Sequence, residues 1–141
     1  FIFFLYLVLN QANADSNVDK LNIEDLIEGK GNIVTDKDNI NLAVFYTGWL
    51  FDKNNIAENK CNKKGKLFDK SKREKDPFTF PLGKGKVIKG WENGFDGMRV
   101  GGIRCLVIPS NQAYGSREIG NIIPRNSSLI FEIELIEILQ N

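Results

Sequence analysis

Aromatic residues are the part of this sequence whose types and spacing point to chemistry. Tyr46, Phe68 and Tyr114 lie near predicted strand ends or in loops, where aromatic side chains can line the mouth of a cavity. Asp69 directly follows Phe68 and adds one carboxylate to the same rim. The aromatic residues expected on the buried side are Tyr46, Phe68, Phe78, Trp91, Tyr114 and Phe131. The pattern indicates binding in an apolar cavity, and the alternative is that these rings only fill the core.

The sequence lacks the residues on which hydrolytic chemistry usually depends. It has no histidine, so the commonest general base and the most versatile zinc ligand are both absent. Its two cysteines, Cys61 and Cys105, are too few for a zinc site built from thiolates. The net charge of +1 gives no electrostatic indication of a nucleic-acid partner. We therefore expect no metal, no cofactor, no nucleic-acid binding and no hydrolysis by a catalytic triad.

Alternating apolar residues predict a sheet of about five strands. The clearest case is the segment 40–48, in which Leu42, Val44 and Tyr46 fall on one face. Four predicted strands span 21–27, 40–48, 103–109 and 128–139. A fifth, broken strand is formed by 66–71 together with 77–83. The residues of the last strand expected to point inward are Leu129, Phe131, Ile133 and Leu135.

One short helix is predicted between the strands. Four apolar residues follow one another at steps of 3, 4 and 3, which places them on one side of a helix. They are Ile88, Trp91, Phe95 and Met98. Gly101 and Gly102 are expected to end this helix. Because an antiparallel sheet needs a cover for its apolar face, the predicted fold class is α+β, with the helix lying on one face of the sheet.

The segment 51–66 is rich in Asn and Lys and has little apolar content, so it is expected to form an exposed loop or the tip of an elongated hairpin. It contains Cys61. Cys105 alternates with Leu106 on its strand, and we place it outside the central core. In an oxidising compartment the two cysteines could form a disulfide, but spacing alone does not establish the Cα separation of about 4.4–6.8 Å that this requires.

The first residues are typical of a secretory signal peptide. Residues 1–9 are uncharged and apolar, and Ala12 and Ala14 form a small-x-small cleavage pattern before Asp15. The run is shorter than the ~20 residues that span a bilayer, so we expect no stable membrane insertion. We interpret residues 1–14 as a truncated signal peptide, which predicts a periplasmic or secreted protein. The alternative is a buried N-terminal strand.

Five blocks in a fixed order give the sequence a family resemblance. They are "FYTGW", "LFDKS", "GKGKVIKGWENGFDGMRVGG", "LVIPSNQAYG" and "GNIIPRNSSLIFEIELIEI". Over about residues 21–138 the chain resembles the FKBP-type peptidyl-prolyl cis-trans isomerases. The resemblance implies an antiparallel half-barrel sheet wrapped around one short helix, with a hydrophobic pocket between them. It also implies a single isomerase domain over 15–141, interrupted by an inserted loop at 51–66.

The resemblance implies a set of pocket residues by position. They are Tyr46, Phe68, Asp69, Phe78, Val87, Ile88, Trp91, Tyr114, Ile122, Ile123 and Phe131. The catalytic residues among them would be Asp69, Tyr114, Trp91, Phe131 and Tyr46. In the implied roles Trp91 forms the floor and Ile122 and Ile123 line a flap, while the Tyr114 hydroxyl and the Ile88 N–H hold substrate carbonyls. Asp69 would face the twisting carbonyl or hold Tyr46, or the pair would only fix the rim.

The implied activity is isomerisation of X-Pro bonds in the folding of exported proteins, by binding the twisted amide in an apolar pocket. The implied partners are proline-containing segments of unfolded client proteins and macrolide inhibitors, and we expect a monomer. The alternative is a proline-peptide-binding chaperone with little or no turnover. Two positions depart from the family pattern: Glu74 stands where an arginine often pairs with the rim aspartate, with Arg73 beside it, and Lys86 stands where glutamate is common.

Overall fold

The computed structural model describes residues 18–35, 39–71 and 75–140. Two sequence predictions, the signal peptide at 1–14 and the role of Arg73 and Glu74 at the rim, therefore lie outside the described residues. Among the residues that are described, no helix is long and apolar enough to cross a membrane.

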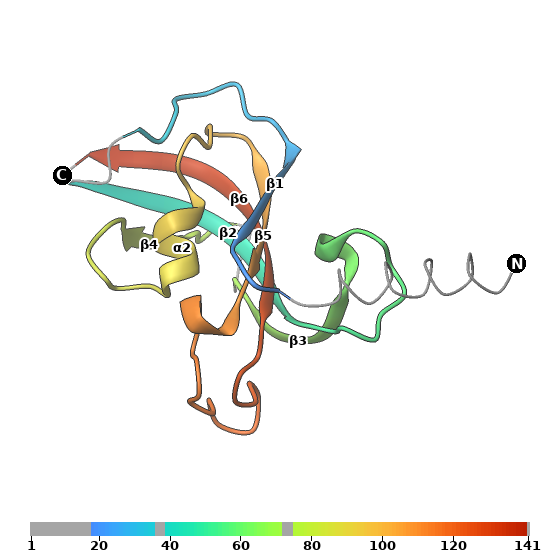
Figure 1. The fold of residues 1–141 in the computed structure, drawn as a ribbon. Helices are drawn as coiled ribbons and strands as arrows, with labels where there is room; N and C mark the ends of the chain where they lie inside the picture. Colours follow the sequence, from blue (N-terminus) through green and yellow to red (C-terminus); the bar gives the residue numbers. More distant parts are fainter. Residues whose placement is uncertain (1–17, 36–38, 72–74, 141) are drawn as a thin grey trace, which may run out of the picture.

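The described chain forms one antiparallel sheet with short helices on its two sides (Figure 1). The strands are β1 (Asn22–Ile27), β2 (Ile40–Phe51), β3 (Lys64–Lys70), β4 (Phe78–Pro81), β5 (Ile103–Ile108) and β6 (Leu129–Gln140). The helical segments are η1 (Lys60–Asn62), α2 (Lys89–Gly94) and η2 (Ser110–Gln112). The strand order is β1-β5-β6-β2-β3, with β4 also paired to β2. The predicted α+β class is confirmed, and the broken strand proves to be two strands on the same partner.

Strand β6 shows why the alternation forms a sheet of this kind. Phe131, Ile133 and Leu135 are at most 4% exposed, as predicted, whereas Glu132 and Glu134 between them keep partial access to solvent. Because successive side chains point to opposite faces of a strand, one face of β6 joins the core and the other faces outward. The long β2–β6 pairing sets Gly48 opposite Phe131, which matters for the cavity described below.

The helix is shorter than predicted. It runs only over Lys89–Gly94, and Phe95 is its C-terminal cap. Phe95 and Met98 are nevertheless buried, at 1% and 2% exposed, because the chain leaves the helix and stays against the core. Gly97, with a φ of 73°, allows the turn that follows. The prediction that Gly101 and Gly102 end the helix was therefore wrong: they lie in the turn that leads into β5.

Two glycines let α2 lie directly on β5. A Cβ atom added at Gly90 would be 2.4 Å from Ile108 Cγ2, and one added at Gly94 would be 2.5 Å from Leu106 Cδ1. A side chain at either position would have to displace the Ile108 or the Leu106 side chain on β5. This close approach places Trp91, between the two glycines, over the middle of the sheet's concave face.

A second, smaller apolar cluster lies on the outer face of the sheet. Its buried members are Cys61, Cys105, Val107 and Ile130. The two cysteines form a disulfide with a Cα–Cα separation of 6.3 Å. Cys105 therefore lies outside the main core, as expected, but it is completely buried. Of the two expectations for 51–66, the tip of an elongated hairpin is the one observed, because β2 extends to Phe51 and pairs with β3, which begins at Lys64. The tip is not exposed throughout, since Cys61 is only 2% exposed.

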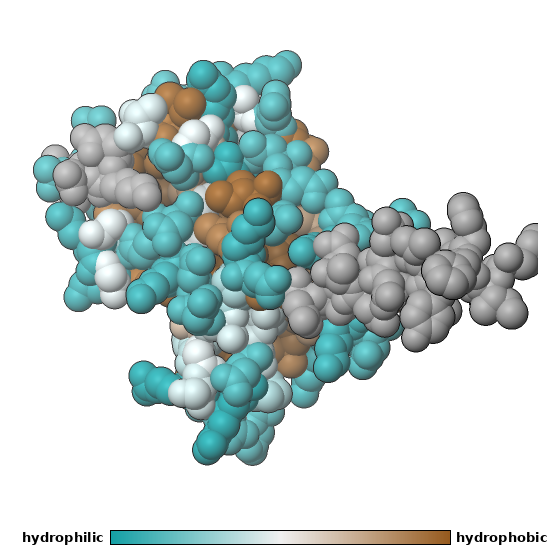
Figure 2. All heavy atoms as spheres, in the orientation of Figure 1, coloured by the Kyte–Doolittle hydropathy of each residue, from teal (hydrophilic) through white to brown (hydrophobic). Residues whose placement is uncertain are grey.

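The outer surface is mainly hydrophilic on the face drawn in Figure 2, with hydrophobic residues showing in smaller patches. The edge strand β1 contributes exposed apolar side chains, since Ile23 and Ile27 are 44% and 54% exposed. Single exposed apolar residues of this kind are normal for a folded protein.

Candidate functional site

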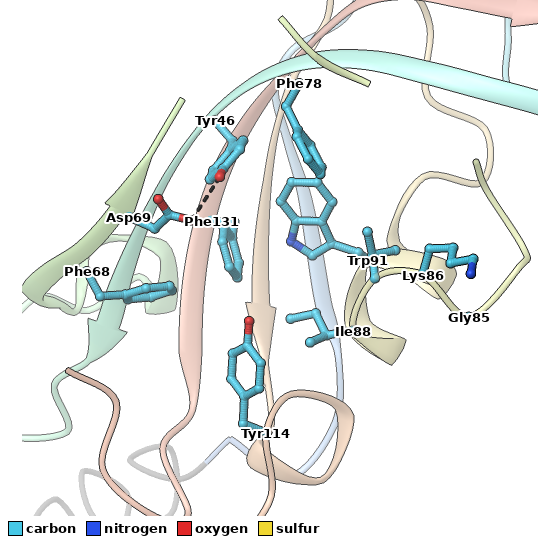
Figure 3. A pocket seen from close by; sticks show the side chains of 11 residues that line it. Tyr46, Phe68, Asp69, Phe78, Gly85, Lys86, Ile88, Trp91, Tyr114 and Phe131 are labelled. Carbon is cyan, nitrogen blue, oxygen red and sulfur yellow. Dashed lines mark hydrogen bonds between the residues drawn. The ribbon is translucent and has the colours of Figure 1, made fainter. Parts of the chain in front are cut away.

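A cavity of about 380 Å³ opens between α2, β2, β3 and the loop after η2 (Figure 3). Most of its lining consists of aromatic and aliphatic side chains, with a carboxylate and a lysine at the rim. The lining residues are Tyr46, Phe68, Asp69, Phe78, Gly85, Lys86, Val87, Ile88, Trp91, Tyr114 and Phe131. The size and lining suit a small, mainly apolar group.

Trp91 forms the floor of this cavity. It is 4% exposed, and the rings of Tyr46, Phe78 and Phe131 meet it edge-on, with centroids 5.2, 6.1 and 5.3 Å from its own. Edge-to-face arrangements at these distances are favourable for aromatic pairs. The floor is therefore closely packed by three rings of the protein itself.

Phe68 and Phe131 form one wall. Their ring centroids are 5.5 Å apart and their planes nearly perpendicular. Gly48 makes this contact possible, because a Cβ atom there would lie 2.8 Å from Phe68 Cζ and 2.9 Å from Phe131 Cε1. A larger residue at position 48 would push the two rings apart and open the wall.

The polar groups of the cavity fall into two kinds. The Tyr46 hydroxyl is already engaged, because it donates a hydrogen bond to Asp69 Oδ2 at 2.8 Å. The Lys70 N–H donates to the other oxygen of the same carboxylate. In contrast, the Tyr114 hydroxyl and the Ile88 N–H have no hydrogen-bond partner among the described residues. Figure 3 shows the Tyr114 hydroxyl directed into the cavity. These two donors are free to bind a ligand's carbonyl groups.

Known proteins are similar in sequence to this chain over most of its length. A family model described as FKBP-type peptidyl-prolyl cis-trans isomerase matches residues 33–136. The chain belongs to this family. An FK506-binding protein of Neisseria meningitidis serogroup A is 45% identical over 119 residues, covering 84% of this chain and 95% of the relative. FK506-binding protein 1A of Neurospora crassa is 42% identical over 121 residues, covering 86% and 90%. FK506-binding protein 2 of Candida glabrata is 46% identical over 100 residues, covering 71% and 65%.

The predicted FKBP pocket residues lie in the cavity lining, with two exceptions, Ile122 and Ile123. The backbones of Ile119 and Ile123 exchange hydrogen bonds, which folds this segment into a tight turn. As a result Ile123 is 4% exposed within the main core, and Ile122 points outward at 50% exposed. Neither isoleucine lines the cavity as expected. Ile119 packs against the same core.

The site prediction did not include Gly85 and Lys86, which also line the FKBP cavity. Their loop is held by the Glu92 carboxylate, which accepts hydrogen bonds from the N–H groups of Gly83 and Gly85. Gly85 has a φ of 67°, a conformation that favours glycine. The available signal was the alternating Gly-Lys run before the helix, because such a run predicts a tight loop beside the cavity. Within the described ranges, no group of three or more potential metal ligands gathers at this loop or elsewhere.

Both cavity tyrosines are expected to titrate above their ordinary range. Burial raises the pKa of Tyr46, and its hydrogen bond to Asp69 and the charge of that carboxylate raise it further. Burial also raises the pKa of Tyr114, with the Asp69 charge as the second cause. In NMR titrations of the ring carbons, both phenols should ionise above the usual pH of about 10. Asp69→Asn should lower the pKa of Tyr46, and an unchanged value would contradict the assigned contact.

The raised pKa values of the two tyrosines determine how the free energy of unfolding changes with pH. A pKa raised on folding contributes stability that is fully present below the unfolded value of about 10 and is lost as the pH rises through the folded value. The contribution of the two phenols should therefore be constant at neutral pH and decline only in alkali.

Proposed function

We propose that this FKBP-family protein isomerises X-Pro bonds in unfolded segments of client proteins by binding the twisted amide in the aromatic cavity. The observation that carries the proposal is the combination of a ring-lined floor at Trp91 with two free donors, the Tyr114 hydroxyl and the Ile88 N–H. A proline ring suits the apolar lining of the cavity, and backbone carbonyl groups of the peptide around it can accept hydrogen bonds from the two donors.

The reaction needs no nucleophile. The barrier to rotation about a peptide C–N bond is about 18–20 kcal/mol because resonance stabilises the planar form. The two isomers of an X-Pro bond differ by only about 0.5–1 kcal/mol, so an enzyme needs only to lower the barrier. The twisted amide has lost its resonance and carries less charge separation, so an apolar cavity favours it over the planar ground state. A hundredfold acceleration requires less than about 3 kcal/mol of such preference.

The geometry supports separate roles for the lining residues. Trp91, Phe68 and Phe131 hold the proline ring and exclude water. Asp69 lies across the cavity from Ile88 (Figure 3), so the carbonyl before proline faces Asp69 and the proline carbonyl faces the Ile88 N–H. Tyr46 holds Asp69 in place through their hydrogen bond.

We also propose that the protein works in the periplasm or outside the cell, on exported clients, as a monomer. The support is the signal-like pattern of residues 1–14 and the buried Cys61–Cys105 disulfide, because disulfides persist in oxidising compartments.

The alternative function is peptide binding without significant turnover. It is favoured by the apolar side chains exposed around the cavity mouth, since Phe78 and Tyr114 are 42% and 36% exposed. A peptide assay with Leu or Phe before Pro separates the two functions. The isomerase proposal predicts an isomerisation rate that rises in proportion to protein concentration. Peptide binding at micromolar protein without any acceleration would instead establish the binding module.

Tyr114→Phe tests the proposed donor. The change keeps the ring and removes the hydroxyl, so the affinity for a macrolide that fills the cavity should weaken by about 0.5–1.5 kcal/mol. Calorimetric titration measures this directly. Tyr46→Phe is the comparison variant: its hydroxyl already binds Asp69 within the protein, so a loss of affinity there reports a displaced Asp69 and not a donor taken from the ligand. Equal affinity of Tyr114→Phe and the wild type would remove the role assigned to Tyr114.

A further inference from the structure

The cavity wall that carries Phe68 and Asp69 stands on an edge strand with irregular pairing. Among the described strands, β3 pairs only with β2. Gly48 lies opposite Asp69 and the next residue, Trp49, lies opposite Leu67, so Phe68 is an extra residue in the ladder. Such β-bulges re-aim side chains next to functional sites, and they also interrupt the pairing that would hold the strand. The direction of Phe68 therefore depends on contacts at the two ends of β3.

The C-terminal end of β3 is fixed close to the cavity. The Ser71 N–H donates to the Tyr46 carbonyl oxygen at 2.9 Å, and the Tyr46 N–H donates to Ser71 Oγ at 3.1 Å. At the N-terminal end Lys64 pairs with Phe51, and the Asp52 N–H donates to the Lys63 carbonyl oxygen at 2.8 Å. A second irregularity between Trp49 and Phe51 separates this pair from the stretch that carries Phe68.

A further anchor at this end is the segment 59–64, here called the strap, which crosses the outer face of the sheet. Glu24, Cys105 and Glu132 lie side by side in one row across β1, β5 and β6. The strap contacts each member of this row. The contacts are hydrogen bonds from Asn59 Nδ2 to the Glu24 carboxylate, the Cys61–Cys105 disulfide and the Lys64–Glu132 ion pair.

The strap is continuous with β3. Lys64 is both its last residue and the first residue of the strand, and its Nζ also lies 4.4 Å from the centroid of the Trp49 ring on β2. Phe68 follows four positions later. At one end β3 is held by the strap, which is attached to β1, β5 and β6. At the other end it is held by the hydrogen bonds between Ser71 and Tyr46. The bulged stretch between these two ends therefore has little freedom to shift its register.

We propose that the strap positions the cavity wall: Cys61 and Lys64, through their bonds to Cys105 and Glu132, hold β3 in the bulged register that aims Phe68 at the bound proline and sets Asp69 against Tyr46. Cys61 and Lys64 are positioning residues, and neither touches the cavity. The inference rests on the proposed function for its kinetic readout and on the fold alone for its structural readout.

The test uses Cys61→Ala, which leaves Cys105 as a buried thiol that behaves as a small apolar side chain. In hydrogen exchange, the amides of 67–70 should lose protection while those of the β5–β6 pairing keep theirs. Because the strap affects how well proline is held, KM and the macrolide dissociation constant should rise together by roughly 3- to 30-fold, with kcat changed little. Val34→Ala is the control for stability, because Val34 is 1% exposed in the core and belongs neither to the strap nor to the cavity lining.

The outcomes separate the two proposals. An unchanged KM together with unchanged hydrogen exchange at 67–70 in Cys61→Ala would overturn the proposed positioning role of the strap. A wild-type protein without isomerase activity would instead refute the proposed function. The hydrogen-exchange comparison would still show whether the strap holds β3 in register. If Cys61→Ala does not fold, Lys64→Met, which keeps the stem and removes the charge, must show the same pattern. An equal rise of KM in Val34→Ala would also contradict the inference.

Discussion

Replacing Arg104 by methionine is expected to lower the free energy of unfolding by roughly 3 kcal/mol, the lower end of the cost of breaking a buried ion pair. Arg104 is 5% exposed. Its Nε and Nη2 donate to the Asp25 carboxylate at 2.7 and 3.1 Å, and its Nη1 donates to the carbonyl oxygens of Gly94 and Asp96 at 2.9 Å each. The variant leaves all these acceptors without their donor. Asp25 keeps some contact with water, which limits the cost.

Urea unfolding followed by circular dichroism measures the loss. Arg99→Met is the matched control, because Arg99 is exposed and, among the described residues, its side chain donates only to the Gly31 carbonyl oxygen. Its effect should stay within about 1 kcal/mol, as is usual for surface substitutions. If both arginine variants lost the same small amount, the Arg104 network would not be a main support of β1 and of the C-terminal end of α2.

Replacing Trp91 by alanine should cost about 3–5 kcal/mol of stability, the usual range for a buried aromatic residue. It should also reduce isomerase activity by tenfold or more, because a loss of about 1.4 kcal/mol of transition-state binding already gives that factor. The physical reason is that Trp91 contacts the rings of Tyr46, Phe78 and Phe131 and also forms the cavity floor.

Activity must be separated from stability in this case. Trp91→Leu retains more apolar volume and should fold well enough for kinetics. Phe95→Leu is the control. The centroid of the Phe95 ring lies 5.7 Å from that of Trp91 and Phe95 is 1% exposed, but it does not line the cavity. It should lose stability and keep its KM. If Trp91→Leu and Phe95→Leu each lost activity only in proportion to their loss of stability, the Trp91 ring would have no direct part in binding.

Much of the fold could be predicted from the sequence because local periodicity follows burial. In β6, Phe131 and Ile133 alternate with glutamates, and the strand forms as expected. The helix length was overestimated, because Phe95 and Met98 continue the helical spacing after the chain has left the helix. Burial alone produces this spacing, and only the backbone conformation at Gly97 distinguishes the turn from another helical turn.

The site was partly predictable for a related reason. Trp91, Tyr114 and the phenylalanines were found because ordered family motifs contain them. Ile122 and Ile123 were misplaced, because the tight turn closed by Ile119 sends one outward and the other into the core. The strap could not be predicted, since a polar segment gives no periodic signal and its attachment depends on a disulfide to a residue 44 positions away.

The central claim is that isomerisation takes place in the cavity above Trp91. The most direct measurement is the isomerisation rate of a Leu-Pro or Phe-Pro peptide during titration with a macrolide that fills this cavity. We predict that the rate falls in proportion to added macrolide and reaches the uncatalysed value at one equivalent, because substrate and inhibitor compete for the same rings. Full activity in the presence of saturating bound macrolide would contradict the account.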